Sequence, residues 1–131
     1  MEDIKSIIKE SSFTAEEGRF VYAKVFSVPD LNGHFMVSRD GDEITVVTKE
    51  ENLSGLDLIE RNPDYYRLIA LNVSKPFYSV GFLATVSQAL ASQGMNILIV
   101  STYSKDYVLV KEDRLEEAKL TLLKLGLKLI K

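Results

Sequence analysis

The second half of the chain constrains the fold more than any other part, because it encodes one helix followed by two adjacent strands. Apolar residues recur at helical spacing through Gly81–Gln93, and Gly94 follows at the position where a left-handed cap is most easily adopted. The next stretch, Asn96–Tyr103, is mostly apolar and β-branched, which favours a buried strand. A two-residue turn then leads into a second strand, Asp106–Lys111.

The flanking segments extend this pattern in both directions. Arg67–Ser74 reads as a strand that precedes the helix, and Asp113 with Glu116 forms a capping box that predicts a second helix. Leu127–Ile130 adds a short last strand. Residues 66–131 therefore predict a β–α–β–β–α–β order, which is an α+β, ferredoxin-like fold with both helices on one face of an antiparallel sheet.

The first half, residues 1–65, is less regular and is expected to form a second unit. Asp3 predicts the cap of a short helix, and Asp40-Gly41-Asp42 is typical of a hairpin turn. Asn62-Pro63 is expected to stop the element before it. The elements expected between these points are strands at Arg19–Val28, His34–Arg39 and Glu43–Thr48, and a helix at Ser54–Glu60.

Four consecutive pieces of the second half carry a family resemblance. They are VGFLA at the start of the helix, A-x-x-G-M-N-I at its end, the ST pair that follows, and DYVLVKEDRLEEA. This block resembles an ACT domain of the aspartate-kinase-like or arginine-sensor-like type, a small-ligand regulatory module of amino-acid metabolism. The resemblance implies an ACT domain at residues 66–131 and a degenerate ACT-like unit at residues 1–65, in a free-standing tandem protein.

Composition argues against catalysis. The chain has no cysteine and one histidine, His34, which is expected at the start of a hairpin strand without a catalytic partner. The motifs of phosphate and dinucleotide binding are missing from the sequence, and the acids fall in turns and helix starts. We therefore predict that the protein is not an enzyme and has no catalytic residues, no metal site and no cofactor.

The first candidate binding segment is the start of the helix, Ser79, Val80, Gly81 and Phe82. Amides at a helix start lack internal partners and lie at the positive end of the helix dipole, so they suit a ligand carboxylate. Gly81 would let a ligand approach the backbone closely. The alternative is that Gly81 only starts a packed helix.

The second candidate segment comes from the resemblance, which places the ligand site along the ST-bearing strand and its turn. Ser101, Thr102, Tyr103 and Asp106 stand at the matching positions. Asp106 would meet a ligand ammonium or guanidinium through a charge-assisted hydrogen bond. Alternatively, Asp106 is a turn residue that bonds its own backbone.

The loop between the first strand and the helix departs from the family pattern. Many ACT domains have an acidic or amide residue there, but Ser74–Tyr78 of this chain carries no acid. Phe77 and Tyr78 instead suggest a more apolar wall.

We therefore expect a regulatory protein that binds a small molecule, an amino-acid effector, at an interface between ACT units and forms a homo-oligomer, most simply a dimer. The alternative is an oligomerisation or protein-interaction module without a ligand. The net charge of −3, with bases scattered among acids, argues against a nucleic-acid partner. The apolar runs are too short to cross a bilayer and the N-terminus does not resemble a signal peptide, so no membrane partner and a cytoplasmic location are expected.

Overall fold

The chain divides into two compact units in the computed structural model, which describes residues 3–75 and 79–130. The first unit comprises residues 1–16 and 67–131, and the second comprises residues 17–66. The boundary expected from the sequence, between residues 65 and 66, lies within one residue of the end of the second unit. The first sixteen residues, however, belong with the C-terminal half.

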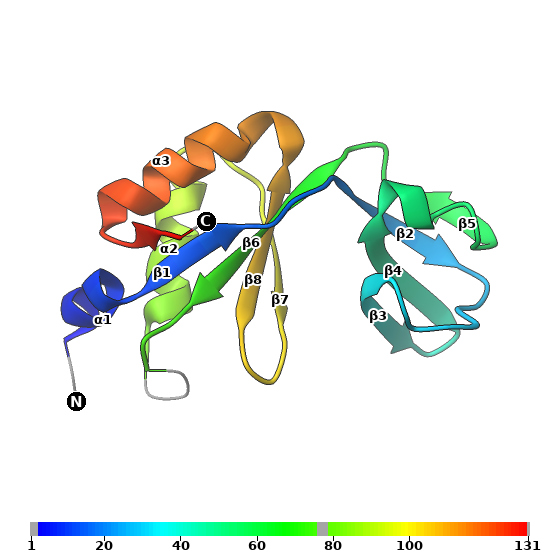
Figure 1. The fold of residues 1–131 in the computed structure, drawn as a ribbon, viewed down its shortest axis with the longest axis horizontal. Helices are drawn as coiled ribbons and strands as arrows, with labels where there is room; N and C mark the ends of the chain where they lie inside the picture. The colour runs from blue at the N-terminus through cyan, green and yellow to red at the C-terminus, as the bar shows by residue number, and fades with distance from the viewer. Residues whose placement is uncertain (1–2, 76–78, 131) are drawn as a thin grey trace. The chain divides into compact units, whose positions relative to one another are not determined.

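From residue 66 onward the chain follows the expected β–α–β–β–α–β order, so the ferredoxin-like fold class is confirmed (Figure 1). The sheet of the first unit has the strand order β7-β8-β6-β1-β9. The elements are α1 (Ile4–Glu10), β1 (Ser12–Ala15), β6 (Tyr66–Asn72), α2 (Phe82–Ala91), β7 (Leu98–Ser101), β8 (Asp106–Lys111), the 3-10 helix η2 (Glu112–Arg114), α3 (Leu115–Leu125) and β9 (Lys128–Leu129).

Strand β1, from the N-terminal part of the chain, lies between β6 and the last strand β9. It runs antiparallel to β6, with Phe13 opposite Leu71, and parallel to β9, with Phe13 opposite Leu129. The antiparallel sheet expected for residues 66–131 did not include β1, and the β1–β9 pair adds a parallel edge to it. The C-terminal strand is only two residues long and hydrogen-bonds to β1, where Ile130 N donates to the Phe13 carbonyl oxygen at 2.9 Å.

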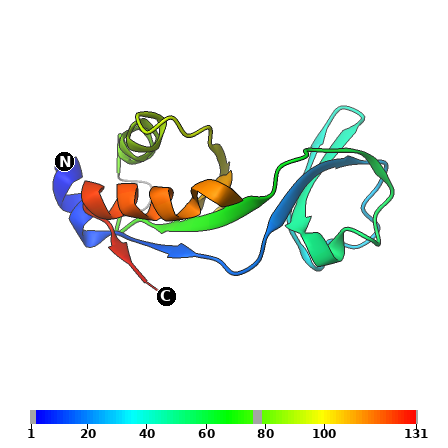
Figure 2. The same ribbon diagram turned by 90° about the horizontal axis from the view of Figure 1, so that it is seen from above.

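Helices α2 and α3 pack beside each other and share one core with the sheet (Figure 2). Their buried residues follow the helical repeat, with spacings of four in α2 and of three and four in α3. Helix α1 contributes two isoleucines to the same core. The core residues supplied by these helices are Ile7, Ile8, Phe82, Val86, Leu90, Leu115, Ala118 and Leu122, and those supplied by strands are Phe13, Ile69, Leu71, Val108 and Val110.

The start of α3 differs from its expected form. Arg114, not Asp113, occupies the N-cap position, and no side chain caps the helix there, so the expected capping box of Asp113 and Glu116 is wrong. A 3-10 turn intervenes, and Arg114 instead bonds the side chain of Glu117 and the carbonyl oxygen of Gln93. The guanidinium thus connects the start of α3 to the end of α2.

The second unit is built from strands in the order β3-β4-β2-β5. Val21, Ala23 and Val25 alternate along β2 and point into its core. The hairpin around Gly41 is also confirmed. The elements are β2 (Phe20–Val25), β3 (His34–Asp40), β4 (Glu43–Lys49), the 3-10 helix η1 (Glu50–Asn52) and β5 (Leu58–Arg61).

The helix expected at Ser54–Glu60 is wrong. Residues 17–66, all of which the structure describes, contain no α-helix, and Leu58–Arg61 forms strand β5. This strand pairs with β2, with Glu60 opposite Lys24. The ladder of hydrogen bonds to β2 overrides the helical preference of a short segment, as tertiary pairing commonly does.

Candidate functional site

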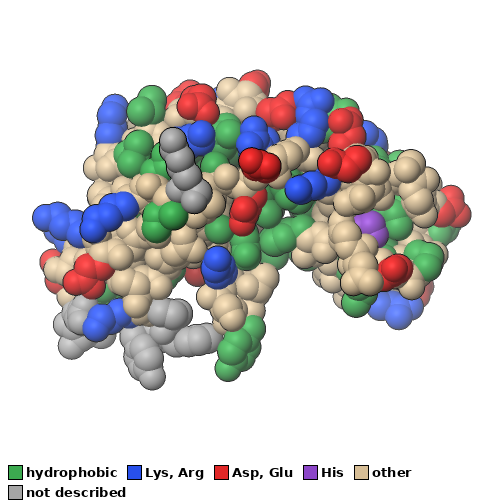
Figure 3. Space-filling model, viewed as in Figure 1, with side chains coloured by type: hydrophobic (Ala, Val, Ile, Leu, Met, Phe, Trp, Pro, Cys, Tyr) green, Lys and Arg blue, Asp and Glu red, His purple; other side chains and the backbone are tan. Residues whose placement is uncertain are grey.

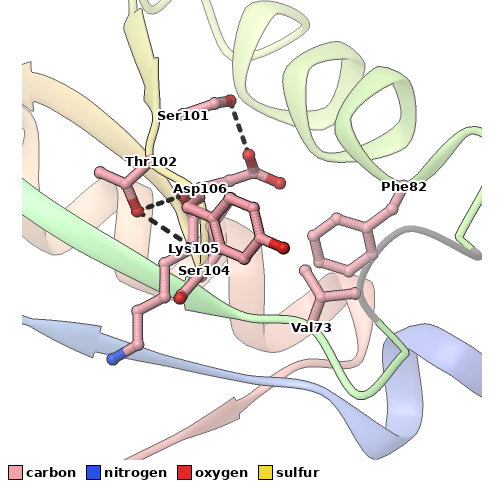
Figure 4. A pocket seen from close by; sticks show the side chains of 9 residues that line it. Val73, Phe82, Ser101, Thr102, Ser104, Lys105 and Asp106 are labelled. Atoms are coloured by element: carbon pink, nitrogen blue, oxygen red, sulfur yellow. Dashed lines mark hydrogen bonds between the residues drawn. The ribbon is translucent and has the colours of Figure 1, made fainter.

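A pocket of about 210 Å³ lies between the tip of the β7–β8 hairpin and the start of α2 (Figure 4). The fold brings together five of the residues proposed from the sequence, which are Phe82, Ser101, Thr102, Tyr103 and Asp106. The other described lining residues are Leu71, Val73, Ser104 and Lys105. Two segments about twenty residues apart in the sequence therefore meet in one cavity of the first unit.

The hairpin positions Asp106 at the mouth of this pocket. Ser101 and Asp106 are opposite each other across β7 and β8, and Ser101 Oγ donates to Asp106 Oδ1 at 2.6 Å. The carboxylate is half-buried, so the hydroxyl orients an acid that still reaches solvent.

The side chain of Thr102 closes the hairpin turn. Its backbone N–H donates to the Lys105 carbonyl oxygen at 2.8 Å, and its Oγ1 accepts from the Lys105 N–H at 3.1 Å. The Thr102 hydroxyl also donates to the Lys105 carbonyl oxygen at 3.1 Å. The Thr102 hydroxyl donates and accepts within the turn, so it has little capacity left to hydrogen-bond a ligand. Its role in the pocket is to fix the shape of the turn.

The start of α2 is a closed turn. Phe82 N–H donates to the Ser79 carbonyl oxygen at 3.1 Å, so this amide, expected to face a carboxylate, already has a partner. Gly81 has φ 88° and ψ −1°, the values of the third residue of a type II turn, a position that favours glycine. Ser79, Val80 and Gly81 are not among the described residues lining this pocket. This geometry supports the alternative that Gly81 serves the helix start.

The inner wall of the pocket is apolar. Leu71 and Val73 are two apart on the chain and flank the cavity with Phe82, whose ring faces Val73 in Figure 4. Sequence reasoning missed Leu71 and Val73, because the strand pattern marks them only as core residues and offers no signal for a pocket. In the same view, the amino group of Lys105 points away from Phe82. Phe77 and Tyr78, expected to form an apolar wall, lie outside the described residues.

His34 lies in the second unit, at the start of β3, where its Nδ1 is 2.8 Å from Thr48 Oγ1. Among residues 3–75 and 79–130, no group of three His, Cys, Asp or Glu side chains is placed to hold a metal ion. Within the same described ranges, no helix combines the length and apolar character needed to span a bilayer. On the face shown in Figure 3, Lys and Arg side chains are interspersed with Asp and Glu side chains.

Comparison with known protein families gives one match in the part of the chain that holds the pocket. Residues 63–124 match the model described as ACT domain. This segment includes strand β6, helix α2, both strands of the hairpin and nearly all of α3. No curated protein matches the chain in sequence.

Solved structures share the fold at low sequence identity. A Vibrio cholerae protein of unknown function, described as a possible transport protein, has a TM-score of 0.80 at 21% identity, over 94% of this chain and 95% of that one. The ligand-free regulatory subunit of aspartate kinase from Thermus thermophilus has a TM-score of 0.64 at 12% identity, over 87% of this chain and 97% of that one. The aspartate kinase of Clostridium acetobutylicum has a TM-score of 0.68 at 15% identity, over 88% of this chain and 34% of that enzyme.

Proposed function

Because residues 63–124 match the ACT-domain model, we propose that the chain is a regulatory protein of the ACT-domain family whose ligand is a small molecule, an amino acid. The observation that carries the proposal is the pocket in which Asp106 and Ser101 face the apolar side chains of Val73 and Phe82. A polar anchor opposite an apolar wall is the usual composition of a small-molecule site.

The chemistry of the pocket favours a ligand with a positively charged amino group. Asp106 is the acid that lines it, and Ser101 holds one carboxylate oxygen in place. The second oxygen would accept a charge-assisted hydrogen bond from an ammonium or guanidinium group. The ligand's apolar part would then contact Leu71, Val73 and Phe82.

The volume of about 210 Å³ limits the ligand to one small molecule. This size accommodates a single amino acid and excludes a folded segment of a partner protein. We place no ligand carboxylate on the amides at the start of α2, because Ser79, Val80 and Gly81 are not among the described lining residues and the Phe82 N–H donates to Ser79.

We propose a regulatory rather than a catalytic role. The regulatory subunit of aspartate kinase from Thermus thermophilus has the same fold over nearly its whole length. Binding would act by favouring one assembly or conformation of the protein over another, because a ligand shifts an equilibrium only through its different affinities for the two states. The effector would be bound where ACT units associate in a homo-oligomer.

A thermal-shift screen of the common amino acids tests this proposal. A ligand at about 100 times its dissociation constant raises the free energy of unfolding by roughly 2.7 kcal/mol. We expect at least one amino acid to give such a shift with the wild type and a smaller one with Asp106→Ala. Asp113→Ala, which removes an exposed acid outside the pocket, serves as the control.

The second candidate function is an interaction module without a ligand. The observation in its favour is that Ile99, on edge strand β7, and Tyr103, at the hairpin tip, are 40% and 89% exposed. If no amino acid shifts the melting temperature while the protein still self-associates, this candidate replaces the first.

A further inference from the structure

The second unit contains a separate pocket of about 240 Å³, formed by the loop before β3 and by the segment that follows β4. The polar side chains that line it are those of Asp30, Asn32, His34 and Asn52, and Pro29, Gly55 and Leu56 complete it. None of these lining residues is a lysine or an arginine. The ACT-domain match begins at residue 63 and does not include this pocket.

Hydrogen bonding determines which nitrogen of His34 carries the proton when the imidazole is neutral. Thr48 is fully buried, and its Oγ1 donates to the Gly33 carbonyl oxygen at 3.2 Å. With the Thr48 hydroxyl donating to Gly33, we infer that the 2.8 Å contact with His34 Nδ1 is made by Nδ1–H as the donor. Nε2 is consequently an acceptor, directed away from Thr48 because the two ring nitrogens point in different directions.

The other polar groups of the pocket also present acceptors. Asn52 Nδ2 donates to the Gly33 carbonyl oxygen at 2.9 Å, which leaves the amide oxygen of Asn52 for another partner. Asp30 Oδ1 accepts from the Asn32 N–H at 3.0 Å, and its second oxygen has no donor among the described residues. The pocket thus combines one negative charge with three acceptors that no described side chain satisfies.

We propose that this pocket binds a small organic cation with several N–H donors, an alkylammonium or guanidinium group, through Asp30, His34 Nε2 and the amide oxygen of Asn52. Such a group supplies a positive charge to Asp30 and donors to the neutral acceptors. A metal ion is a poorer match, since the described residues offer no group of three His, Cys, Asp or Glu side chains. The site is independent of the pocket beside Asp106.

The single histidine of the chain provides the readout. In long-range ¹H–¹⁵N correlation spectra of the full-length protein, recorded where the imidazole is neutral, we expect the tautomer protonated at Nδ1. Titration with methylguanidinium or ethylammonium over the millimolar range should shift the Nε2 resonance saturably. N-methylurea, a neutral analogue of methylguanidinium, should shift it much less.

The variant Asp30→Asn tests the charge. Asparagine retains an oxygen that accepts from the Asn32 N–H, so the loop is preserved while the charge is lost. We expect binding of the cation to weaken at least about tenfold, as for a lost hydrogen bond to a charged group. Asp42→Asn, in the exposed β3–β4 turn outside the pocket, makes the same change in net charge and should leave the affinity unchanged.

Three results would overturn the proposal. The first is a tautomer protonated at Nε2, and the second is the absence of a saturable shift with both cations. The third is equal affinity of the wild type and Asp30→Asn, which would assign the shift to nonspecific association.

Discussion

Ser101 and Asp106 are opposite each other across the β7–β8 hairpin, and the serine hydroxyl donates to Asp106 Oδ1 at 2.6 Å. The bond joins two of the residues that the family resemblance assigns to the ligand site. It also leaves the second carboxylate oxygen for a ligand, because an ionised carboxylate accepts several hydrogen bonds.

Replacement of Asp106 by alanine should weaken a ligand with a positive group by about 1.5–3 kcal/mol, the usual contribution of a hydrogen bond to a charge. Ser101→Ala should have a smaller effect, since it frees the carboxylate without removing it. Calorimetry with an amino acid found by thermal shift measures both. Unchanged affinity in Asp106→Ala would show that this acid is only a turn residue.

Substitution at Gly81 should reduce the stability of the protein whether or not ligand is present. A Cβ there would meet no atom within 4 Å, but φ is 88°, where an L-residue is strained by about 1–2 kcal/mol. Gly81→Ala should therefore have a lower melting temperature than the wild type. Gly81→Asn should lose less, because asparagine tolerates a positive φ better than alanine does. Gly55→Ala, where neither a positive φ nor a close neighbour is present, is the matched control. Gly81→Leu should carry the same strain.

Truncation of Phe13 should destabilise the protein by about 3–5 kcal/mol, the range for a large aromatic removed from a core. Phe13 is fully buried in β1 and packs with residues of α2 and α3. Phe26→Ala removes the same side chain from a position that is 63% exposed and should cost far less. Chemical denaturation measures the free energy of unfolding of both variants. An equal loss in Phe13→Ala and Phe26→Ala would disprove the packing of residues 1–16 with residues 67–131.

Glu117 should titrate below its ordinary pKa of 4.5, because hydrogen bonds from Arg114 favour the charged form. A lowered pKa in the folded state means that the pair's contribution to stability is present above pH 4.5 and is lost as the pH falls through the lower value. NMR titration of the Glu117 carboxyl measures the shift. Arg114→Ala should return the pKa of Glu117 toward 4.5, and no change between the two proteins would refute the assignment.

The protein should form a dimer that depends on the β7 edge. Ile99 is 40% exposed on this strand, which pairs only with β8 among the described strands, and exposed edges commonly recruit a second sheet. Ile99→Lys should shift the mass from light scattering toward the monomer. Leu120→Lys makes the same kind of change on α3, where Leu120 is 57% exposed, and should have no effect. A monomeric wild type at tens of micromolar would contradict the prediction, whereas dissociation by Leu120→Lys alone would move the interface to the helix.

Local patterns in the sequence were sufficient for much of the fold. The spacing of Phe82, Val86 and Leu90 identified α2, and the Gly41 turn identified the β3–β4 hairpin. The exact residue that caps a helix was predicted less reliably, as the capping box expected at Asp113 shows. An acid near a helix start satisfies that pattern whether or not a 3-10 turn moves the true N-cap.

The residues of the candidate site were likewise only partly predictable from the sequence. The resemblance selected Asp106 and its neighbours, and the pocket indeed contains them. Leu71 and Val73 could not be assigned to it from the sequence, because a strand residue reads as core whether it faces a helix or the edge of a cavity. Similarly, no pattern around His34 indicates its tautomer, which depends on a buried threonine fourteen residues away.

The sequence by itself determined the order of strands and helices in residues 66–131 and the hairpin that carries Asp106, because periodicity, turn residues and caps act between near neighbours. Only the tertiary structure decided that β1 enters the sheet between β6 and β9 and that Leu58–Arg61 is a strand. Both depend on hydrogen-bond ladders to distant segments. A short strand gains its stability from the partner beside it, and its own residues do not specify that partner.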